Sequence, residues 1–227
     1  MKTKVLTICV LAAVLAIGST AQATPIVVSV TGTATGSNLG YTLGGSYTFN
    51  WVISDTYTEN TYDAINANNF QWYEGGAGWS SIFSDVWGDG ISGTYVPSAT
   101  SPQTAILGYD NGPSADTLVF YAGTDSYGVA PIGLTANGES IRFVEADDII
   151  IGDLDFSGAG SFIAPATYMA DYIGTYALSS GTIKLKSPSG DAEFNPNSIT
   201  IAAVPEPATM CLLGLGGLGL LRRKRGV

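Results

Sequence analysis

The sequence predicts an all-β protein: a single antiparallel β-sandwich domain of jelly-roll-like architecture, set between a signal peptide and a short C-terminal membrane helix. Runs rich in Val, Ile, Thr, Tyr and Phe recur through residues 24–203, and Gly, Asn, Asp and Ser separate them every several residues. No part of this region has a convincing helical period. Ten or so short strands are typical of two packed sheets.

The N-terminus has the pattern of a secretory signal peptide. Lys2 and Lys4 precede an apolar segment from Val5 to Ile17, and the tripeptide Ala21-Gln22-Ala23 has the small-x-small pattern that signal peptidase reads. The apolar segment is too short to be a spanning helix. We therefore expect residues 1–23 to be removed by signal peptidase and the mature chain to be exported through the inner membrane.

Residues 24–203 are expected to form one acidic domain of unknown function. In order, the expected strands are Ile26 to Thr35, Tyr41 to Ile53, Ile91 to Val96, Ala105 to Tyr109, Thr117 to Ala122, Glu139 to Val144, Asp148 to Phe156, Tyr172 to Leu178, Thr182 to Lys186 and Ser198 to Ala203.

Alternation within two of these runs predicts which side chains face the core. Ile183 and Leu185 alternate with lysines, so the two aliphatic side chains should point inward and the lysines toward water. Tyr47, Phe49 and Trp51 share one face of their strand in the same way. A helical turn is expected only at Tyr62 to Tyr73, where Asp63 could provide the N-cap.

Charge and residue usage exclude several functional classes. Without its two ends the chain keeps three basic and eighteen acidic residues, a net charge of −15, which argues against binding to nucleic acid. Cys9 and Cys211 both lie in the predicted end segments, and the sequence has no histidine. Thiolate chemistry, Ser-His-Asp catalysis and His-ligated zinc are therefore not expected, and we interpret the protein as a non-enzyme without a cofactor.

Asp153 and Asp155 are the candidates for calcium ligation. With Ser157 and Gly158 they match the first six positions of an EF-hand loop. The twelfth position, which should be a bidentate Glu, is Ala164, so the pattern favours solvent-facing acids on a strand and its turn. Calcium binding elsewhere on so acidic a surface stays open.

Aromatic residues are concentrated between residues 70 and 87, where glycines and acids interleave with them. Such side chains can stack on sugar rings while polar neighbours bind the hydroxyls, or they can simply fill a core. The candidates for a carbohydrate-binding site are Trp72, Tyr73, Trp79 and Trp87. A glycosidase would need two suitably spaced carboxylates, a distance that sequence spacing does not give, so a glycan-active enzyme is the third alternative.

The C-terminal segment 204–227 has three parts in order. Val204 leads into Pro205-Glu206-Pro207, an apolar run of 14 residues follows from Ala208 to Leu221, and the chain then carries a cationic cluster. That cluster consists of Arg222, Arg223, Lys224 and Arg225. Cations are costly inside a bilayer, about 2.5 to 3.5 kcal/mol each, so the cluster should stop transfer and leave its end on the cytoplasmic side.

This tail resembles the PEP-CTERM sorting signal. The resemblance implies that the protein is a substrate of exosortase, a membrane-embedded protease or transpeptidase, which would recognise Pro205-Glu206-Pro207 and remove the tail near it. It also implies a bacterium that makes exopolysaccharide and biofilm. We therefore expect a non-catalytic cell-surface or matrix protein that is anchored transiently by its tail, with a carbohydrate-binding module for exopolysaccharide as the alternative.

Overall fold

The structure is a computed structural model of the 227-residue chain. It describes residues 24–54, 57, 64–65, 69–74, 82–96, 104–109, 115–123, 132–152, 154, 156 and 164–204. Almost every described element is an antiparallel strand, which confirms the all-β class. The predicted signal peptide, residues 1–23, and the segment 205–227 lie outside the described residues.

The elements follow one another along the chain as β1 (Ile26–Ala34), η1 (Asn38–Gly40), β2 (Ser46–Ile53), β3 (Ala64–Ile65), β4 (Asn69–Glu74), β5 (Phe83–Gly88), β6 (Ile91–Gly93), β7 (Thr104–Tyr109), β8 (Asp116–Gly123), β9 (Leu134–Ala136), β10 (Glu139–Ser140), β11 (Phe143–Ile151), α2 (Pro165–Met169), η2 (Ala170–Tyr172), β12 (Gly174–Ala177), β13 (Ser180–Ser187) and β14 (Gly190–Ala203).

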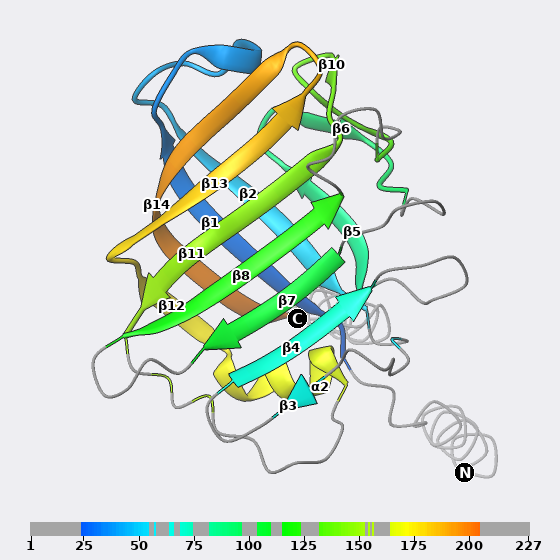
Figure 1. The fold of residues 1–227 in the computed structure, drawn as a ribbon, viewed down its shortest axis with the longest axis vertical. Helices are drawn as coiled ribbons and strands as arrows, with labels where there is room; N and C mark the ends of the chain where they lie inside the picture. Colours follow the sequence, from blue (N-terminus) through cyan, green and yellow to red (C-terminus); the bar gives the residue numbers. More distant parts are fainter. Residues whose placement is uncertain are drawn as a thin grey trace, which may run out of the picture.

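One continuous sheet of 11 strands makes up most of the molecule. Its order is β3-β4-β7-β8-β11-β13-β14-β1-β2-β5, with β12 added beside β14. The sheet curls on itself like half a barrel, so that β1, β2 and β5 pass behind β11, β8 and β7 (Figure 1). A second, small sheet contains β10, β9 and β6. The structure therefore does not confirm two large facing sheets, and the sandwich is replaced by one curled sheet.

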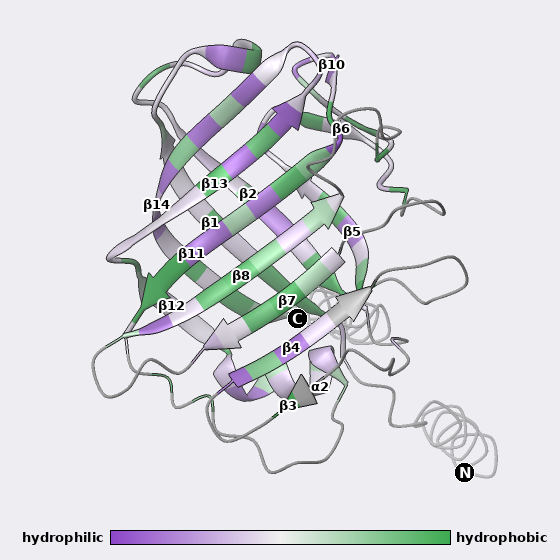
Figure 2. Cartoon of the chain, in the orientation of Figure 1, coloured by the Kyte–Doolittle hydropathy of each residue, from purple (hydrophilic) through white to green (hydrophobic). Residues whose placement is uncertain are grey.

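The core fills the inside of this curl. Trp51 on β2 meets Phe120 on β8 with ring centroids 6.1 Å apart, although the two strands are far apart in the sheet order. The predicted alternation on β13 is confirmed, since Ile183 and Leu185 are fully buried. Phe49 and Trp51 are buried on one face of β2, as expected. Figure 2 shows the resulting alternation of hydrophilic and hydrophobic residues along β13 and β14.

An aromatic cluster closes the upper end of the curl. The ring of Tyr41 packs edge-on against Tyr47 and Phe194, with centroids 4.8 and 4.9 Å away. The Tyr41 hydroxyl donates to the backbone carbonyl of Asp89 at 2.9 Å. Burial, reinforced by the charge of Asp89, raises the pKa of this phenol well above its usual range.

A second aromatic cluster closes the lower end, where α2 lies beneath β4 (Figure 1). Tyr168 on α2 contacts Phe70 and Trp72 on β4, with centroids 4.9 and 5.4 Å away. Phe70 also packs edge-on against Phe156 at 5.1 Å. Gly108 on β7 lies opposite Phe70 and leaves room for it, because a Cβ at that position would collide with the phenyl ring.

The helical turn expected at Tyr62 to Tyr73 is wrong. The structure has β3 and β4 there, and β4 pairs with β7 along its whole length. Local residue preference was overridden by pairing with a distant strand, and by the burial of Phe70 and Trp72 that this pairing allows.

The strand β5 ends the order of the large sheet among the described strands. It is therefore an edge strand in that order, and the unpaired backbone groups of an edge strand can pair with strands of other chains. The carboxylate of Asp85 accepts a hydrogen bond from the backbone N–H of Val86 at 2.9 Å. A charged side chain therefore satisfies one backbone N–H group of this edge strand.

Candidate functional site

The first and last strands of the domain lie side by side and bring the two ends of the domain together. Ile26 of β1 pairs with Ala203 of β14, 177 positions later in the sequence. Beyond this pair, the Val204 N–H donates to the carbonyl of Pro25 at 2.8 Å. We call this end of the molecule the terminal pole and define it by Pro25, Ile26, Ile173, Ala203 and Val204.

The last strand reaches the terminal pole from the interior of the sheet. β14 pairs with β1 on one side and with β13, then β12, on the other. Ile199 and Ile201 are buried and fix the strand to the core. Gly174 of β12 pairs with Ile201, so Ile173, which is 52% exposed, lies at the same pole. The chain thus leaves the domain from a firmly paired strand.

Two of the aromatic candidates lie in different environments. Trp72 is fully buried, which removes it as a stacking surface for a sugar in this structure. Trp87 is 49% exposed, but it lies on β5, at the opposite end of the sheet order from β4. The structure therefore does not bring Trp72 and Trp87 together on one surface.

The other two candidates give less information. Tyr73 lies on β4 opposite Ala105 of β7, and Trp79 falls outside the described residues. Asp153 and Asp155 are also outside the described part of the chain. In the part that is described, no three His, Cys, Asp or Glu residues are grouped so that they could hold a metal ion.

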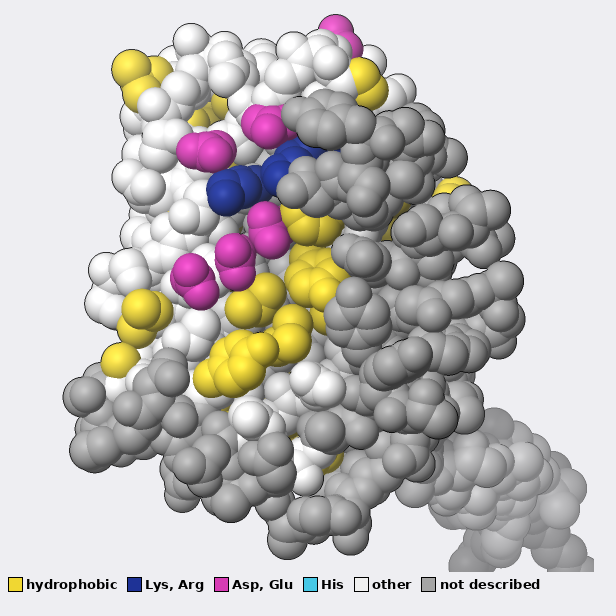
Figure 3. Space-filling model, viewed as in Figure 1, with side chains coloured by type: hydrophobic (Ala, Val, Ile, Leu, Met, Phe, Trp, Pro, Cys, Tyr) yellow, Lys and Arg dark blue, Asp and Glu magenta, His cyan; other side chains and the backbone are white. Residues whose placement is uncertain are grey.

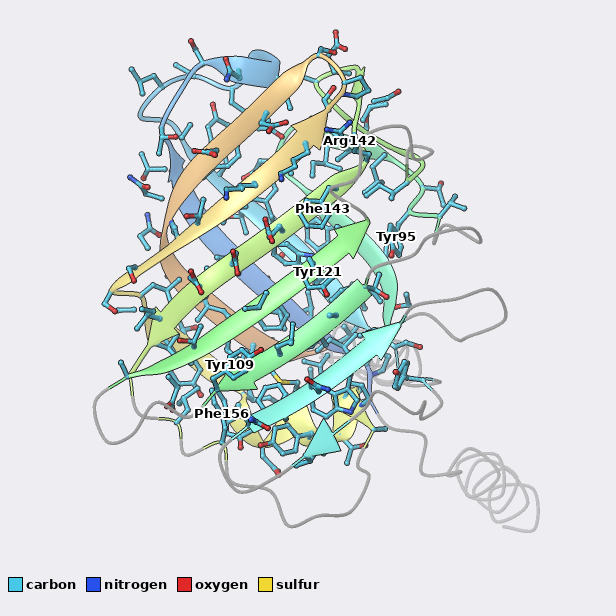
Figure 4. The ribbon with its side chains drawn as sticks, viewed as in Figure 1. Tyr95, Tyr109, Tyr121, Arg142, Phe143 and Phe156 are labelled. Carbon is cyan, nitrogen blue, oxygen red and sulfur yellow. The ribbon has the colours of Figure 1, made fainter. Side chains whose placement is uncertain are left out.

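A surface that sequence reasoning missed lies on the outer face of the curled sheet. Leu107 pairs with Val119, and Tyr121 contacts Phe143 with centroids 6.0 Å apart. Tyr109, 40% exposed, continues this row (Figure 4). We call these five residues the outer stripe; Tyr109 is exposed, Leu107 and Tyr121 are half-buried, and Val119 and Phe143 are buried. Its signal in the sequence is alternation, since Ile106 and Phe120 between these positions are fully buried.

Charged side chains lie next to the outer stripe, as Figure 3 shows. Lys184 of β13 sits between Glu145 of β11 and Glu193 of β14 in the register of the three strands. Lys186 lies over the ring of Phe143, with its Nζ 5.5 Å from the centroid. The face therefore combines flat aromatic rings with donors and acceptors of hydrogen bonds.

A shallow hollow of about 350 Å³ lies far from the terminal pole, near the start of β14. It is lined by Thr35, Gly36, Asn38, Asp191 and Glu193. Two of the lining side chains are engaged with backbone: Thr35 Oγ1 donates to the carbonyl of Glu193 at 3.0 Å, and Asn38 Nδ2 donates to that of Asp191 at 2.7 Å. These bonds fasten the β1–β2 loop to β14.

Comparison with known families identifies the segment that follows the terminal pole. Residues 203–225 match the family model described as the PEP-CTERM protein-sorting motif. The chain carries a PEP-CTERM motif. The protein is therefore an exported substrate of an exosortase-type sorting system. Neither a curated protein nor a solved structure matches the chain.

The PEP-CTERM match begins inside the folded domain, because Ala203 is the last residue of β14. Val204 is the only residue of the predicted sorting tetrapeptide that lies in the described part of the chain. Pro205-Glu206-Pro207 and the cationic cluster Arg222, Arg223, Lys224 and Arg225 lie outside it. Among the described helices, none has the length and hydrophobicity needed to cross a bilayer.

Proposed function

We propose that the processed protein acts without catalysis at the cell surface or in the extracellular matrix, in association with exopolysaccharide or biofilm. The observation that carries this proposal is that the PEP-CTERM motif directly follows a folded domain whose two ends meet at one pole. Signal peptidase and the sorting enzyme would each remove one end, and the paired strands between them would remain intact.

The chemistry of the chain supports a structural or binding role. The sequence offers no histidine, and its two cysteines lie in the predicted end segments. The most common general base near neutral pH and the strongest side-chain nucleophile are therefore not available to the mature domain. Its net charge of −15 is suited to solubility outside the cell and unsuited to contact with anionic polymers such as nucleic acid.

The intact mass of the protein recovered from the surface and medium of an exosortase-bearing host tests the proposal. We expect a chain that begins near Thr24 and ends between Val204 and Pro207, with any added mass reporting covalent transfer to a lipid or glycan. Replacing Pro205-Glu206-Pro207 by three alanines should leave full-length protein in the inner membrane. Surface protein that still contains residues 222–227 would contradict processing.

A second candidate function is carbohydrate binding, and the outer stripe is the observation that favours it. Tyr109 is 40% exposed and Tyr121 is half-buried on the same side of the sheet. Glu145 pairs with Tyr121, and Lys184 lies beside Glu145 on the next strand. Ring faces can contact the apolar face of a sugar while charged neighbours bind its hydroxyls. The ligand in this proposal is a polysaccharide of the producing cell.

Alanine substitutions on the two exposed aromatic surfaces separate the sites. If the outer stripe binds polysaccharide, Tyr109→Ala and Tyr121→Ala should weaken retention by host exopolysaccharide in affinity electrophoresis. Trp87→Ala, on β5, is the matched control and should migrate as the wild type does. Loss of retention only in Trp87→Ala would place the glycan on the other surface, and no retention of the wild type would remove this candidate.

A further inference from the structure

The terminal pole combines two features that the sequence alone does not bring together. The start of β1 and the end of β14 are neighbours in one sheet, joined by the Ile26–Ala203 pair and the Val204–Pro25 hydrogen bond. Both predicted membrane-inserting segments therefore attach to the same end of the domain. We infer that the terminal pole faces the membrane, within about 10 Å of its headgroups, until the tail is removed.

The number of residues between the domain and the apolar run sets this distance. Val204 is still hydrogen-bonded to the domain, and only Pro205, Glu206 and Pro207 separate it from Ala208. A fully extended chain advances at most about 3.6 Å per residue, so the four steps from Val204 to Ala208 span at most about 14 Å. A tether this short keeps the terminal pole close to the bilayer and limits how far the domain can turn about its attachment point.

The length of the apolar run determines how deep its first residue, Ala208, would lie in a bilayer that the run spans. Its 14 residues would extend only about 21 Å as a helix, against a hydrocarbon core of about 30 Å. A run this short has no length to spare outside the core, so if it spans the bilayer as a helix, Ala208 would lie at or below the hydrocarbon boundary. Subtracting a headgroup layer of about 5 to 8 Å leaves the terminal pole less than about 10 Å above the headgroups.

The tether, rather than adhesion, holds the pole in place. The mature chain carries a net charge of −15, and anionic headgroups attract only basic segments. In this orientation the opposite pole is far from the bilayer, because β14 has 14 residues and strands rise about 3.3 Å per residue, which gives at most about 45 Å along the strand. Removal of the tail would then remove the link that holds the pole at this distance.

Two exposed aliphatic residues at opposite poles provide a matched pair of probe sites. Ile173 is 52% exposed at the terminal pole, and Leu43 is 65% exposed in the β1–β2 loop at the other pole. With Cys9→Ala and Cys211→Ala, the chain has no cysteine except the one introduced. The full-length variants Ile173→Cys and Leu43→Cys would be produced in a host without the sorting enzyme, labelled with a small fluorophore, and reconstituted into neutral phosphatidylcholine vesicles.

Quenching by lipids that carry a nitroxide on the headgroup measures the distance of each site from the membrane surface. We expect severalfold stronger quenching at position 173 than at position 43, and Ala203→Cys should reproduce the result at position 173. Equal quenching at the two poles, or no quenching at either one in protein that floats with the vesicles, would overturn the inference and leave the sorting function intact.

The same preparation separates this inference from the function on which it rests. If the full-length protein does not float with the vesicles, the tail is not a membrane segment, and both the orientation of the pole and the proposed sorting by membrane anchoring fail. A circular dichroism spectrum equal to that of the wild type shows that each cysteine variant is folded.

Discussion

The two tryptophans that the structure describes on β4 and β5 show how different the roles of aromatic residues close in sequence can be. Trp72 is fully buried against Tyr168 and Phe70, whereas Trp87 is about half exposed on the edge strand. Their sequence contexts are similar, since glycines and acids accompany both. Burial, which depends on strand pairing, separates a core residue from a surface residue here.

Alanine at these two positions should therefore have unequal effects on stability. Trp72→Ala removes a large buried side chain and should lower the free energy of unfolding by about 3 to 5 kcal/mol. Trp87→Ala, the matched control, should cost less than about 1 kcal/mol, as surface substitutions usually do. Urea unfolding followed by circular dichroism measures both, and similar losses in the two variants would contradict the packing described for β4.

The raised pKa of Tyr41 predicts that the protein loses stability at high pH. Its pKa is raised in the folded state, mainly by burial, so the neutral phenol is favoured by folding. The stabilisation is complete below the pKa of an unfolded tyrosine, about 10, and is lost as the pH rises above that value. The melting temperature should therefore fall in strongly alkaline solution.

Replacing Tyr41 should reduce the fall in melting temperature at alkaline pH. Tyr41→Phe lacks the ionising group, so its melting temperature should decline less than that of the wild type above pH about 10. At neutral pH the variant should lose about 1 kcal/mol, because its hydrogen bond to the Asp89 carbonyl is gone. Tyr109→Phe is the control at an exposed phenol, and an equally shallow decline in that variant would contradict the assignment to Tyr41.

Among the elements, β5 determines how the sheet ends. A free edge can recruit strands of other chains, and charged residues on edge strands oppose this. Asp85 provides such a charge and also accepts the Val86 N–H. Asp85→Ala should increase self-association, measured by light scattering during concentration of the protein.

A second variant controls for the loss of one negative charge in Asp85→Ala. Glu193→Ala removes one acid from β14, which lies in the interior of the sheet, and should leave the protein monodisperse to the same concentration as the wild type. If both variants associate equally, lowered net charge explains the effect and Asp85 has no special role at the edge.

Most elements could be predicted from the sequence where alternation or β-branched runs are strong. The run from Ser180 to Ser187 is an example, because its lysines and aliphatic residues alternate and the structure confirms both faces. The segment with β4 was misread as helical, because its Ala and Asn residues carry no strand signal and its burial depends on β7 and α2. The short helix α2 was not predicted at all.

For the whole molecule, strand alternation gives the inner and outer faces but not the partner of each strand. A two-sheet sandwich and one curled sheet need the same alternating strands, so the sequence could not distinguish them. The sorting motif could be read directly, since its residues are contiguous. The terminal pole and the outer stripe could not, because they join strands such as β1 and β14 that are distant in sequence.

Processing should respond to the distance between the domain and the motif. An enzyme that binds the chain near Pro205 has to act beside a strand that is paired up to Ala203. Opening one or two backbone hydrogen bonds at about 1 kcal/mol each would slow binding about 5- to 30-fold. Six Gly and Ser residues inserted between Val204 and Pro205 should therefore speed trimming, as measured by pulse–chase labelling.

The same six residues inserted between Gly36 and Ser37 provide the control. This loop is exposed and lies at the opposite pole, so the trimming rate should stay at the wild-type value. An unchanged rate with the insertion at Val204 would mean that the enzyme acts on the motif without disturbing the end of β14.

The central position of the last strand also determines when the protein can fold. Without β14 the large sheet separates into two groups, with β3, β4, β7, β8, β11 and β13 on one side and β1, β2 and β5 on the other, and β12 loses its partner. Contacts between residues so far apart in sequence form slowly, because a long loop must close first. A chain emerging during translocation therefore has no complete sheet until residues 190–203 have crossed. The strand order therefore predicts that a chain crossing the membrane from its N-terminus completes the large sheet only after its last strand has emerged.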